Sequence, residues 1–417
     1  MKINALHINH FRGFKQLKLD FSKRTTVFVG INGVGKTALL DCLAILLSHP
    51  LNKIRSATGK GRTFIEWDIN NDSNETWNSL IVSFAGKQVT WHLTKTRSGK
   101  KATKKTDLKE IELIVEQVQS TLENTSNASI PLTVYYPVNR AVLDIPLRVR
   151  GKQEFKQLTA YDQALVGIAR EFRVFFEWFR KREDIENEYI RQEAGYRDKQ
   201  LEWVRKAVQL LMPGYSDLRV RRSPLRMSLM KQKQELIINQ LSDGEKCLLA
   251  LTGDLARRLA IAHPALPNPL EGQAIVLIDE IELHLHPQWQ RRVIPTLEST
   301  FPNCQFVVST HSPQVISEVQ RQERQVYFLR TTEEEIVAEP VEAYGKDTNF
   351  ILEIFMETEE RPAEVKQEIL ALFRLIDEGK LEEARNAMQQ LSSKIGNDEP
   401  ELVRAEVLIH RKEVLGR

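Results

Sequence analysis

Cysteine is scarce in this 417-residue sequence, which contains only Cys42, Cys247 and Cys304. These residues lie far apart in the chain and form no C-x-x-C pair. Neither a disulfide framework nor a zinc cluster can therefore be drawn from them. We expect that any metal bound by the chain is held by oxygen ligands.

Long apolar runs are also missing. No segment approaches the roughly 18 apolar residues that a membrane-spanning helix needs. Residues 1–7 lack the apolar core and the small-residue cleavage site of a signal peptide. With 41% hydrophobic and 28% charged residues, the composition excludes a disordered or fibrous chain. We expect a cytoplasmic protein of two or three packed units that has no contact with a membrane.

No sign of charge dominates the whole chain, whose net charge is +3, but the charges are unevenly placed. Residues 331–417 hold 11 basic and 21 acidic side chains, whereas residues 1–330 hold 48 basic and 35 acidic ones. The basic body favours polyanions such as nucleotides or nucleic acid. The acidic tail favours either a basic protein surface or simple hydration.

The order of elements indicates an α/β nucleotide-binding fold. Alternating apolar and polar residues predict strands at 3–9 and 17–21, and a buried strand at 25–29 runs through a glycine-rich turn into a helical run at 38–47. Further alternating segments predict an antiparallel lobe beside the main sheet, at 63–67, 80–84 and 89–93.

The second half of the chain reads as a helical insertion, more of the sheet and a helical tail. Residues 152–206 contain almost no glycine or proline, and their phenylalanines recur at helical spacing. The later elements are predicted as a basic strand-like stretch at 218–230, strands at 235–239, 274–278 and 305–309, a helix at 245–262, and tail helices near 363–377, 380–394 and 400–414.

Residues 30–37 match the pattern G-x-x-x-x-G-K-[ST], with a strand before it and a helix after it. Glycines in such a loop let backbone N–H groups surround a phosphate, and the helix N-terminus adds its dipole. Lys36 is expected to reach the β- and γ-phosphates, and Thr37 to offer its hydroxyl to Mg²⁺. The pattern therefore predicts an ATP-binding loop containing Asn32, Gly33, Gly35, Lys36 and Thr37.

The buried strand at 274–278 ends in two carboxylates, Asp279 and Glu280. The carboxyl ends of buried parallel strands are where ligands bind in α/β folds. We expect Asp279 to hold Mg²⁺ and Glu280 to polarise the attacking water as a general base.

Between these motifs, Ser242 and Glu245 have the spacing of a helix capping box. Residues 241–245 also resemble the L-S-x-G-E signature of ATP-binding-cassette (ABC) ATPases, and His311 resembles their switch histidine. The resemblance implies a Walker A loop, a Walker B strand and a signature in which Ser242, Gly244 and Glu245 act on ATP held by a second subunit. A homodimer or higher homo-oligomer follows.

The chain departs from that family pattern in two places. Asp243 stands where transporters usually have glycine, and the glutamine that normally links Mg²⁺ to the lid is not placed, although Gln88 and Gln163 are candidates. Arg12, in a turn resembling the R-G-F turn of RecF-like and OLD-like ATPases, lies either near the nucleotide or in a solvated turn.

The histidine pair after the Walker B strand and two basic clusters each have two possible interpretations. His284 and His286 could share one face of a strand and bind a metal, but the stretch 279–287 resembles the D-loop at the dimer seam of these ATPases. Two basic clusters, Lys95–Lys105 and Arg219–Arg226, are either solvated or in contact with the phosphate backbone of DNA.

Over nearly its whole length the chain resembles the PtuA-like ATPases of Septu and retron-associated anti-phage defence systems. The ATPase motifs, residues 135–140 and the tail from Tyr344 carry this resemblance. It implies self-assembly, a separately encoded HNH nuclease (PtuB-like) as partner, and, in retron systems, a reverse transcriptase with its DNA.

The expected architecture is an α/β ABC-type P-loop ATPase head with a mixed central sheet and an antiparallel lobe. We divide the chain into an N-terminal ATPase lobe with Walker A, a helical insertion with a basic strand region, a C-terminal ATPase lobe with the signature, Walker B and the switch histidine, and an acidic helical tail. Their respective ranges are 1–150, 151–235, 236–343 and 344–417.

Nuclease chemistry is not apparent in the chain itself. Only 106 residues follow His311, the chain contains no D-x-D pair, and no His and Asn residues compose an HNH-type metal motif. The favoured hypothesis is an ATP-driven regulator of a separate defence nuclease. The alternatives are a RecF-like repair ATPase that acts directly on DNA, and a defence ATPase that traps another effector, as in PARIS-type systems.

Overall fold

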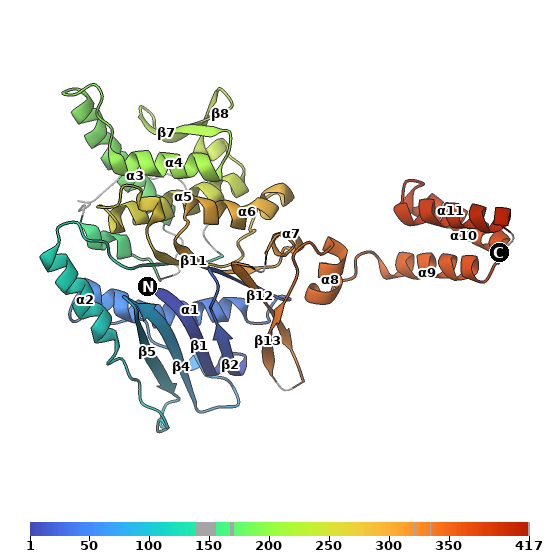
Figure 1. The fold of residues 1–417 in the computed structure, drawn as a ribbon, viewed down its shortest axis with the longest axis horizontal. Coiled ribbons are helices and arrows are strands. Elements are labelled where there is room, and N and C mark those ends of the chain that lie inside the picture. Colours follow the sequence, from blue (N-terminus) through green and yellow to red (C-terminus); the bar gives the residue numbers. More distant parts are fainter. Residues whose placement is uncertain (139–155, 167–170, 321, 334, 416–417) are drawn as a thin grey trace. The chain divides into compact units, whose positions relative to one another are not determined.

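Parallel strands with apolar sequences form the centre of the molecule. The computed structural model describes residues 1–138, 156–166, 171–320, 322–333 and 335–415, and arranges six strands in the order β13-β12-β3-β11-β10-β6 (Figure 1). Five of them are parallel, and β13 pairs antiparallel at one edge. Their bounds are Thr25–Val29 (β3), Leu132–Tyr136 (β6), Ala274–Ile278 (β10), Cys304–Thr310 (β11), Arg324–Thr331 (β12) and Ile336–Val341 (β13).

A second, antiparallel sheet forms the predicted lobe, in the order β2-β1-β4-β5. Helix α1 packs against strands of both sheets, and the Trp91 indole donates a 3.0 Å hydrogen bond to the Leu46 carbonyl of that helix. The elements are β1 (Lys2–Phe11), β2 (Phe14–Asp20), α1 (Lys36–Arg55), β4 (Glu75–Phe84), β5 (Lys87–Thr96) and α2 (Ile111–Asn124).

The prediction of a strand at 63–67 is wrong. Residues Glu66–Asp68 form a 3-10 turn, η1. The Asp68 carboxylate accepts a 3.0 Å hydrogen bond from the Ile65 backbone N–H, and this local bond favours a turn over a strand.

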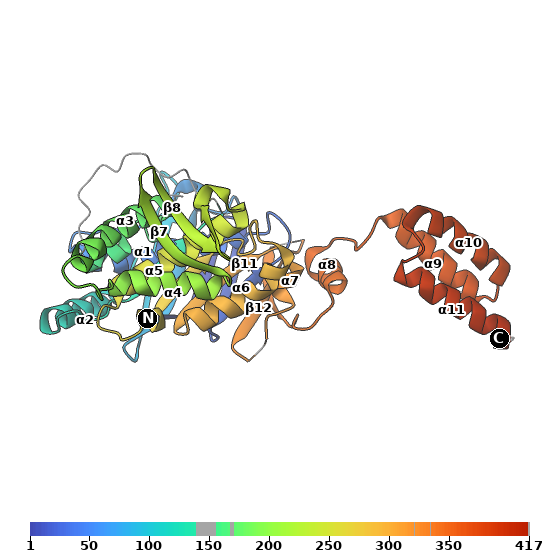
Figure 2. The ribbon, with the colours of Figure 1, turned by 90° about the horizontal axis from the view of Figure 1, so that it is seen from above.

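Helices and a small sheet cover the other face of the central sheet (Figures 1 and 2). The basic stretch predicted at 218–230 is a hairpin of two strands, which turns at Ser223 and Pro224. Residues 152–155 and 167–170 of the predicted insertion lie outside the described residues. The elements are η2 (Gln157–Tyr161), α3 (Glu171–Ile190), α4 (Lys199–Leu211), β7 (Tyr215–Arg222), β8 (Leu225–Lys231), β9 (Gln234–Ile237), η3 (Ile238–Gln240) and α5 (Asp243–Ala262).

The remaining elements of the larger unit connect the strands of the central sheet. They are η4 (Pro269–Glu271), α6 (Pro287–Thr300) and α7 (Pro313–Ile316). Helix α5 is buried along most of its length because α3 and α4 pack on it from one side and β6 contacts it from the other. Among the described residues, no helix is both long and apolar enough to cross a membrane.

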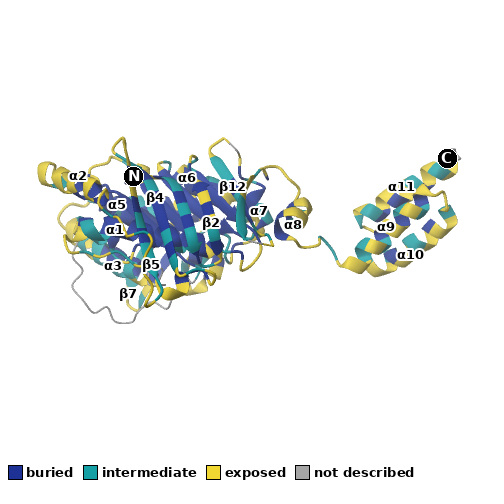
Figure 3. Cartoon of the chain, turned by 90° about the horizontal axis from the view of Figure 1, so that it is seen from below, coloured by how far each residue is buried: buried dark blue, intermediate teal, exposed yellow. Residues whose placement is uncertain are grey.

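The chain divides into two compact units, Met1–Thr348 and Asn349–Arg417. The smaller unit has its own core (Figure 3), in which Ile369, Leu372 and Ile376 pack with residues of two further helices. The apolar stripe of the tail is therefore largely used inside the tail, although Leu370 is exposed. Its helices are α8 (Thr348–Met356, starting at the boundary), α9 (Ala363–Asp377), α10 (Leu381–Ile395) and α11 (Pro400–Leu415).

Candidate nucleotide-binding site

The glycine-rich loop joins β3 to α1 and has the backbone conformation that its glycines allow. Gly33 and Gly35 have φ angles of 80° and 102°, which side chains with a Cβ rarely adopt. A Cβ at Gly35 would also lie 2.7 Å from the Phe14 ring, whereas one at Gly33 would meet nothing within 4 Å. One side of the loop is thus packed against β2. Asn32, Gly33 and Thr37 are exposed.

Lys36 is buried and folded back over this loop. Its ammonium donates hydrogen bonds of 2.7 Å to the Gly30 carbonyl and 2.8 Å to the Ile31 carbonyl, and lies 3.4 Å from Nδ1 of His311. Burial lowers the pKa of Lys36 to about 8, although the charges of Glu282, Asp279 and Glu280 oppose this shift. The lysine therefore lies among carboxylates from a neighbouring part of the sheet.

Asp279 and Glu280 directly follow β10 and are held by the adjacent strand. The Ser309 hydroxyl donates to Asp279 Oδ1 and accepts a 2.8 Å hydrogen bond from the Glu280 backbone N–H. Asp279 is only 1% exposed, and Glu280 has a φ of 46°. Ser309 was not singled out from the sequence, where it is one of several polar residues in this strand.

His311 follows β11 and lies near both Lys36 and Glu280. Its Nε2 lies 3.9 Å from Glu280 Oε1, and its backbone N–H donates to the carboxylate of Glu282, another residue that sequence analysis missed. Burial, and then the charge of Lys36, lower the pKa of His311, while Asp279 opposes them. Burial also raises the pKa of Glu282. These effects favour the neutral form of His311.

The order of the strands explains why these side chains meet. Strand β11 lies between β3 and β10 in the sheet, and all three strands are parallel. The Walker A loop, Asp279 and His311 each follow one of these strands, so they all lie at the carboxyl edge of the central sheet.

The signature residues lie at the start of α5, where Ser242 is the N-cap. Its hydroxyl accepts a 3.3 Å hydrogen bond from the Glu245 backbone N–H, and Glu245 Oε2 accepts a 2.7 Å bond from the Ser242 N–H. The predicted capping box is confirmed. Glu245 also accepts hydrogen bonds from Tyr215 and, at 2.8 Å, from Lys231. Burial raises the pKa of Glu245, but these partners lower it to about 2.

Gly244 is required by packing against the segment that follows Asp279. A Cβ at this position would lie 2.3 Å from the His284 carbonyl oxygen. His284 has a φ of 60°, and His286 caps α6 by accepting a 3.3 Å hydrogen bond from Gln288 N–H. The two histidines are thus not on a strand, and the premise of the metal interpretation is wrong.

Arg12 forms two ion pairs, and 34% of its side chain is exposed. Its guanidinium lies 2.8 Å from Asp41 and 2.9 Å from Asp68. Asp41 is one turn beyond Thr37 on α1, so the Arg12 turn is tied to the helix that starts at the Walker A loop. Contact of Arg12 with a nucleotide stays a prediction.

Gln88 and Gln163, the two candidates for the glutamine that links Mg²⁺ to the lid, make none of the contacts that join Lys36, Asp279 and His311. Gln88 is an exposed residue near the start of β5, and Gln163 lies in a loop whose Ala164 carbonyl accepts a 2.7 Å bond from Tyr135 N–H. Asn139 and Arg140, which follow β6, lie outside the described residues.

Known proteins resemble this chain over much of its length. A family model described as an AAA domain matches residues 5–241. "Retron Ec83 probable ATPase" of Escherichia coli is 29% identical over 99% of this chain and 87% of its own length. Septu protein PtuA of Bacillus thuringiensis is 23% identical over 75% of this chain and 72% of its own. A RecF protein of Macrococcus caseolyticus is 34% identical, but over only 21% of this chain and 25% of its own.

The family model covers more than half of the chain and includes the Walker A loop. The fold places the strand that ends at Asp279, and His311, beside that loop. The chain belongs to the AAA domain family, and it is an ATPase similar to the retron and Septu PtuA proteins.

Proposed function

We propose that the carboxyl edge of β3, β11 and β10 binds ATP, with Lys36 and the N–H groups of the Walker A loop on its phosphates. Lys36, His311 and the carboxylates after β10 converge at one point of this edge, and this convergence carries the proposal. The Lys36 ammonium now uses two loop carbonyls, and phosphate oxygens would replace them as acceptors.

The same edge offers donors that suit Mg²⁺. Thr37 and Asp279 supply a hydroxyl and a carboxylate, which are the hard oxygen ligands that this ion prefers. Ser309 already orients the Asp279 carboxylate. When bound, Mg²⁺ would neutralise charge that develops on the phosphates.

Glu280 and His311 are the proposed catalytic pair. A carboxylate at Glu280 can accept the proton of an attacking water. The imidazole of His311 lies 3.9 Å from that carboxylate and would orient it once the two groups close to hydrogen-bond distance. The Ser309 hydroxyl fixes the backbone of Glu280, so the position of the base is set by the sheet.

We infer that the signature completes the site across a dimer. Ser242 is exposed at the N-terminus of a 20-residue helix, where free N–H groups and the helix dipole favour an anion. Gly244 is buried against the segment after Walker B, so signature and D-loop form one surface of each subunit. A second copy is the partner that this surface would meet.

Mixed dimers test this arrangement. A Lys36→Ala chain and a Ser242→Arg chain, each inactive alone, should together regain about one active site per dimer, because one site then combines two intact halves. A mixture of Lys36→Ala with Glu280→Gln is the matched control and should regain nothing, since both changes affect Walker sites. If verified mixed dimers showed no rescue, the proposal that the signature acts on ATP of the second subunit would be wrong.

We also propose that the chain assembles with and regulates a separate HNH nuclease in an anti-phage defence complex. A retron reverse transcriptase and its DNA would join that complex where they are encoded beside the chain. The relationship to retron and Septu proteins supports this assignment. The acidic tail adds support, because Val403, Val407 and Val414 of α11 are exposed outside its core.

Co-purification tests the tail. Val403→Asp with Val407→Asp should abolish capture of the nuclease encoded beside the gene and leave the ATPase rate unchanged. Leu370→Asp is a matched change at another exposed apolar position of the tail and should leave capture intact. Undiminished capture by the double variant would exclude docking through α11.

The RecF-like alternative has weaker support. The RecF protein compared above matches about a fifth of the chain, whereas the retron ATPase matches nearly all of it. The neighbouring reading frame separates the two: a small HNH protein favours the defence complex, and replication genes favour RecF-like repair.

A further inference from the structure

A tryptophan stands almost fully exposed on the antiparallel lobe. Trp67, in the 3-10 turn η1, is 89% exposed, and Ile65 beside it is 54% exposed. Large aromatic side chains are usually buried in monomers, so an exposed indole beside another apolar side chain indicates a contact surface. The side chain of Glu66 accepts a 2.8 Å hydrogen bond from the Ser98 backbone N–H, which fastens this turn to the basic loop after β5.

The basic loop has a fixed backbone. His92 and Asp107 exchange two backbone hydrogen bonds of 3.0 Å, and Thr94 N–H donates a 2.9 Å bond to the Thr106 hydroxyl. Thr103 N–H donates a 2.8 Å bond to Glu75. The loop therefore folds back along the hairpin of β4 and β5, and its lysines start from a defined scaffold.

The lysines of this loop are not neutralised. In the part of the chain that the structure describes, no carboxylate oxygen lies within 4.0 Å of the ammonium groups of Lys95, Lys100, Lys101, Lys104 and Lys105. The nearby Glu66 and Glu75 accept backbone N–H groups of the loop instead. Lys104 lies 3.8 Å from the centre of the Trp77 ring, which adds a second aromatic to the cationic surface.

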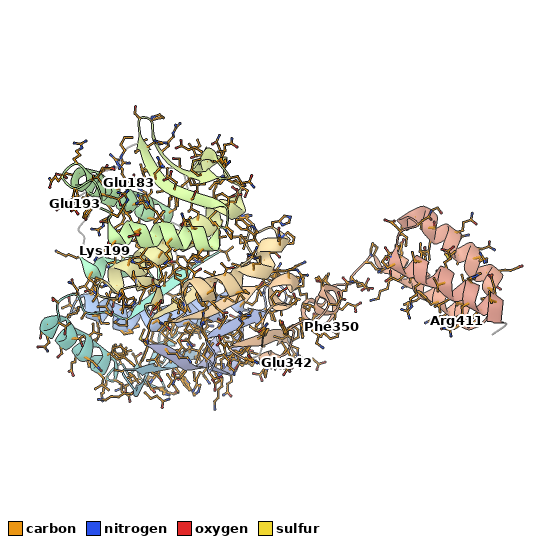
Figure 4. All side chains as sticks on the ribbon, turned by 45° about the horizontal axis from the view of Figure 1, so that its top comes forward. Glu183, Glu193, Lys199, Glu342, Phe350 and Arg411 are labelled. Atoms are coloured by element: carbon orange, nitrogen blue, oxygen red, sulfur yellow. The ribbon has the colours of Figure 1, made fainter. Side chains whose placement is uncertain are left out.

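The second basic cluster differs in this respect. Arg219, Arg221 and Arg222 pair with Asp217, Glu235 and Glu183, the last of which is labelled in Figure 4. Arg222 also pairs with Asp184. Two clusters that look alike in sequence therefore differ in the structure. Three of the four arginines pair with carboxylates of the chain, whereas the lysines are available to an external anion.

We propose that Trp67 and the loop Lys95–Lys105 bind single-stranded nucleic acid, with a base stacked on the indole and phosphates on the lysines. Aromatic rings combined with a positively charged track are the common way in which proteins bind unpaired strands. A duplex hides its base faces and would engage only the lysines. Neither Trp67 nor these lysines belong to the residues proposed to bind ATP, so the proposal can be tested independently of the proposed ATP mechanism.

Fluorescence anisotropy with the full-length protein tests the proposal. The probes are a labelled oligo(dT) of about 20 nucleotides, its RNA counterpart and a duplex of equal length. Trp67→Ala should weaken single-strand binding about tenfold and leave duplex binding unchanged. Trp67→Phe should bind single strands nearly as well as the wild type, because it keeps a ring for stacking. The DNA and RNA arms distinguish the two kinds of strand.

Reversing the charge of loop lysines is the second part of this binding experiment. Lys100→Glu with Lys101→Glu should weaken binding to every probe and reduce the salt dependence, because each removes a phosphate contact. Lys87→Glu with Lys109→Glu is the matched control on the same lobe, outside the loop, and should have a smaller effect. Wild-type melting temperature and ATPase rate show that each variant is folded. No binding of single strands by the wild type, or equal affinity for them after Trp67→Ala, overturns the proposal.

Discussion

The hydroxyl of Tyr136 donates a 3.0 Å hydrogen bond to the carboxylate of Asp254, in the middle of the helix that begins with the signature. The backbone oxygen of the same tyrosine accepts a 2.9 Å bond from Asp279 N–H. Asp254 is fully buried and pairs with Arg257 and Arg258. One residue at the edge of the sheet therefore connects the proposed Mg²⁺ ligand to the signature helix.

We expect Tyr136→Phe to weaken this connection without unfolding the protein. Loss of one hydrogen bond to a buried carboxylate should cost about 2 kcal/mol, because Asp254 keeps its two arginines. The ATPase kcat should fall about tenfold while ATP affinity changes little. Tyr161→Phe is the control, since its hydroxyl donates a 2.8 Å bond to the Pro131 carbonyl. An equal loss of kcat in both variants would assign Tyr136 a purely structural role.

Two substitutions in the proposed ATP site should have different effects. Lys36→Ala removes the phosphate contact and should abolish ATP binding, whereas Glu280→Gln removes only the proposed base and should trap bound ATP. Equilibrium binding of a fluorescent ATP analogue, followed by single-turnover hydrolysis, separates the two steps. Nucleotide affinity of Lys36→Ala equal to that of the wild type would refute the site assignment.

The pKa of Lys36 predicts proton uptake on ATP binding. Burial lowers it from 10.5 to about 8 in the protein without nucleotide, and phosphates would raise it again. Calorimetry near pH 8.5, in two buffers of different ionisation enthalpy, should therefore give different apparent binding enthalpies. Lys36→Arg stays charged and should show no such difference. Buffer-independent enthalpy in the wild type would contradict the lowered pKa.

The lowered pKa of Lys36 also makes the stability of the fold depend on pH. The unfolded chain binds this proton more tightly than the folded one, so the free energy of unfolding rises with pH between about 8 and 10.5. Lys36→Met removes the titrating group. Its stability relative to the wild type should therefore be greatest below pH 8 and should decline across that window.

The sequence predicted the central strands at 25–29, 274–278 and 305–309 and the Walker residues, because local patterns determine them, but it did not predict β6, β12 or β13. The strand at 274–278 is fully apolar and has the predicted bounds, and the carboxyl-edge rule then places Asp279 correctly. Ser309 and Tyr136 were out of reach, since their roles depend on which strands become neighbours. The hairpin at 215–231 was missed because its basic residues alternate without a clear turn signal apart from Ser223 and Pro224.

Gly244→Ala tests the contact between the signature and the D-loop. An added Cβ would lie 2.3 Å from the His284 carbonyl oxygen, which is backbone and cannot rotate away. We expect a loss of about 2 kcal/mol in stability and a larger loss of ATPase activity, as the start of α5 is pushed outward. Gly195→Ala, which would meet nothing within 4 Å, should be neutral. Wild-type stability and activity in Gly244→Ala would disprove the packing constraint.

Lys231 and Tyr215 face each other on β8 and β7, and both donate hydrogen bonds to Glu245. Glu245 in turn accepts the 2.7 Å bond from Ser242 N–H, so the hairpin holds the signature cap in place.

Lys231→Met should lower kcat about fivefold, equivalent to about 1 kcal/mol, with little change in KM for ATP. Lys231→Arg should restore kcat because it keeps a charged donor. Partners lower the pKa of Glu245 from 4.5 to about 2, so the stability they contribute is present above pH 4.5 and is lost as the pH falls toward 2. The wild type and Lys231→Met should therefore converge in melting temperature across that range. A drop in melting temperature at pH 7 without any change in kcat would limit Lys231 to a structural role.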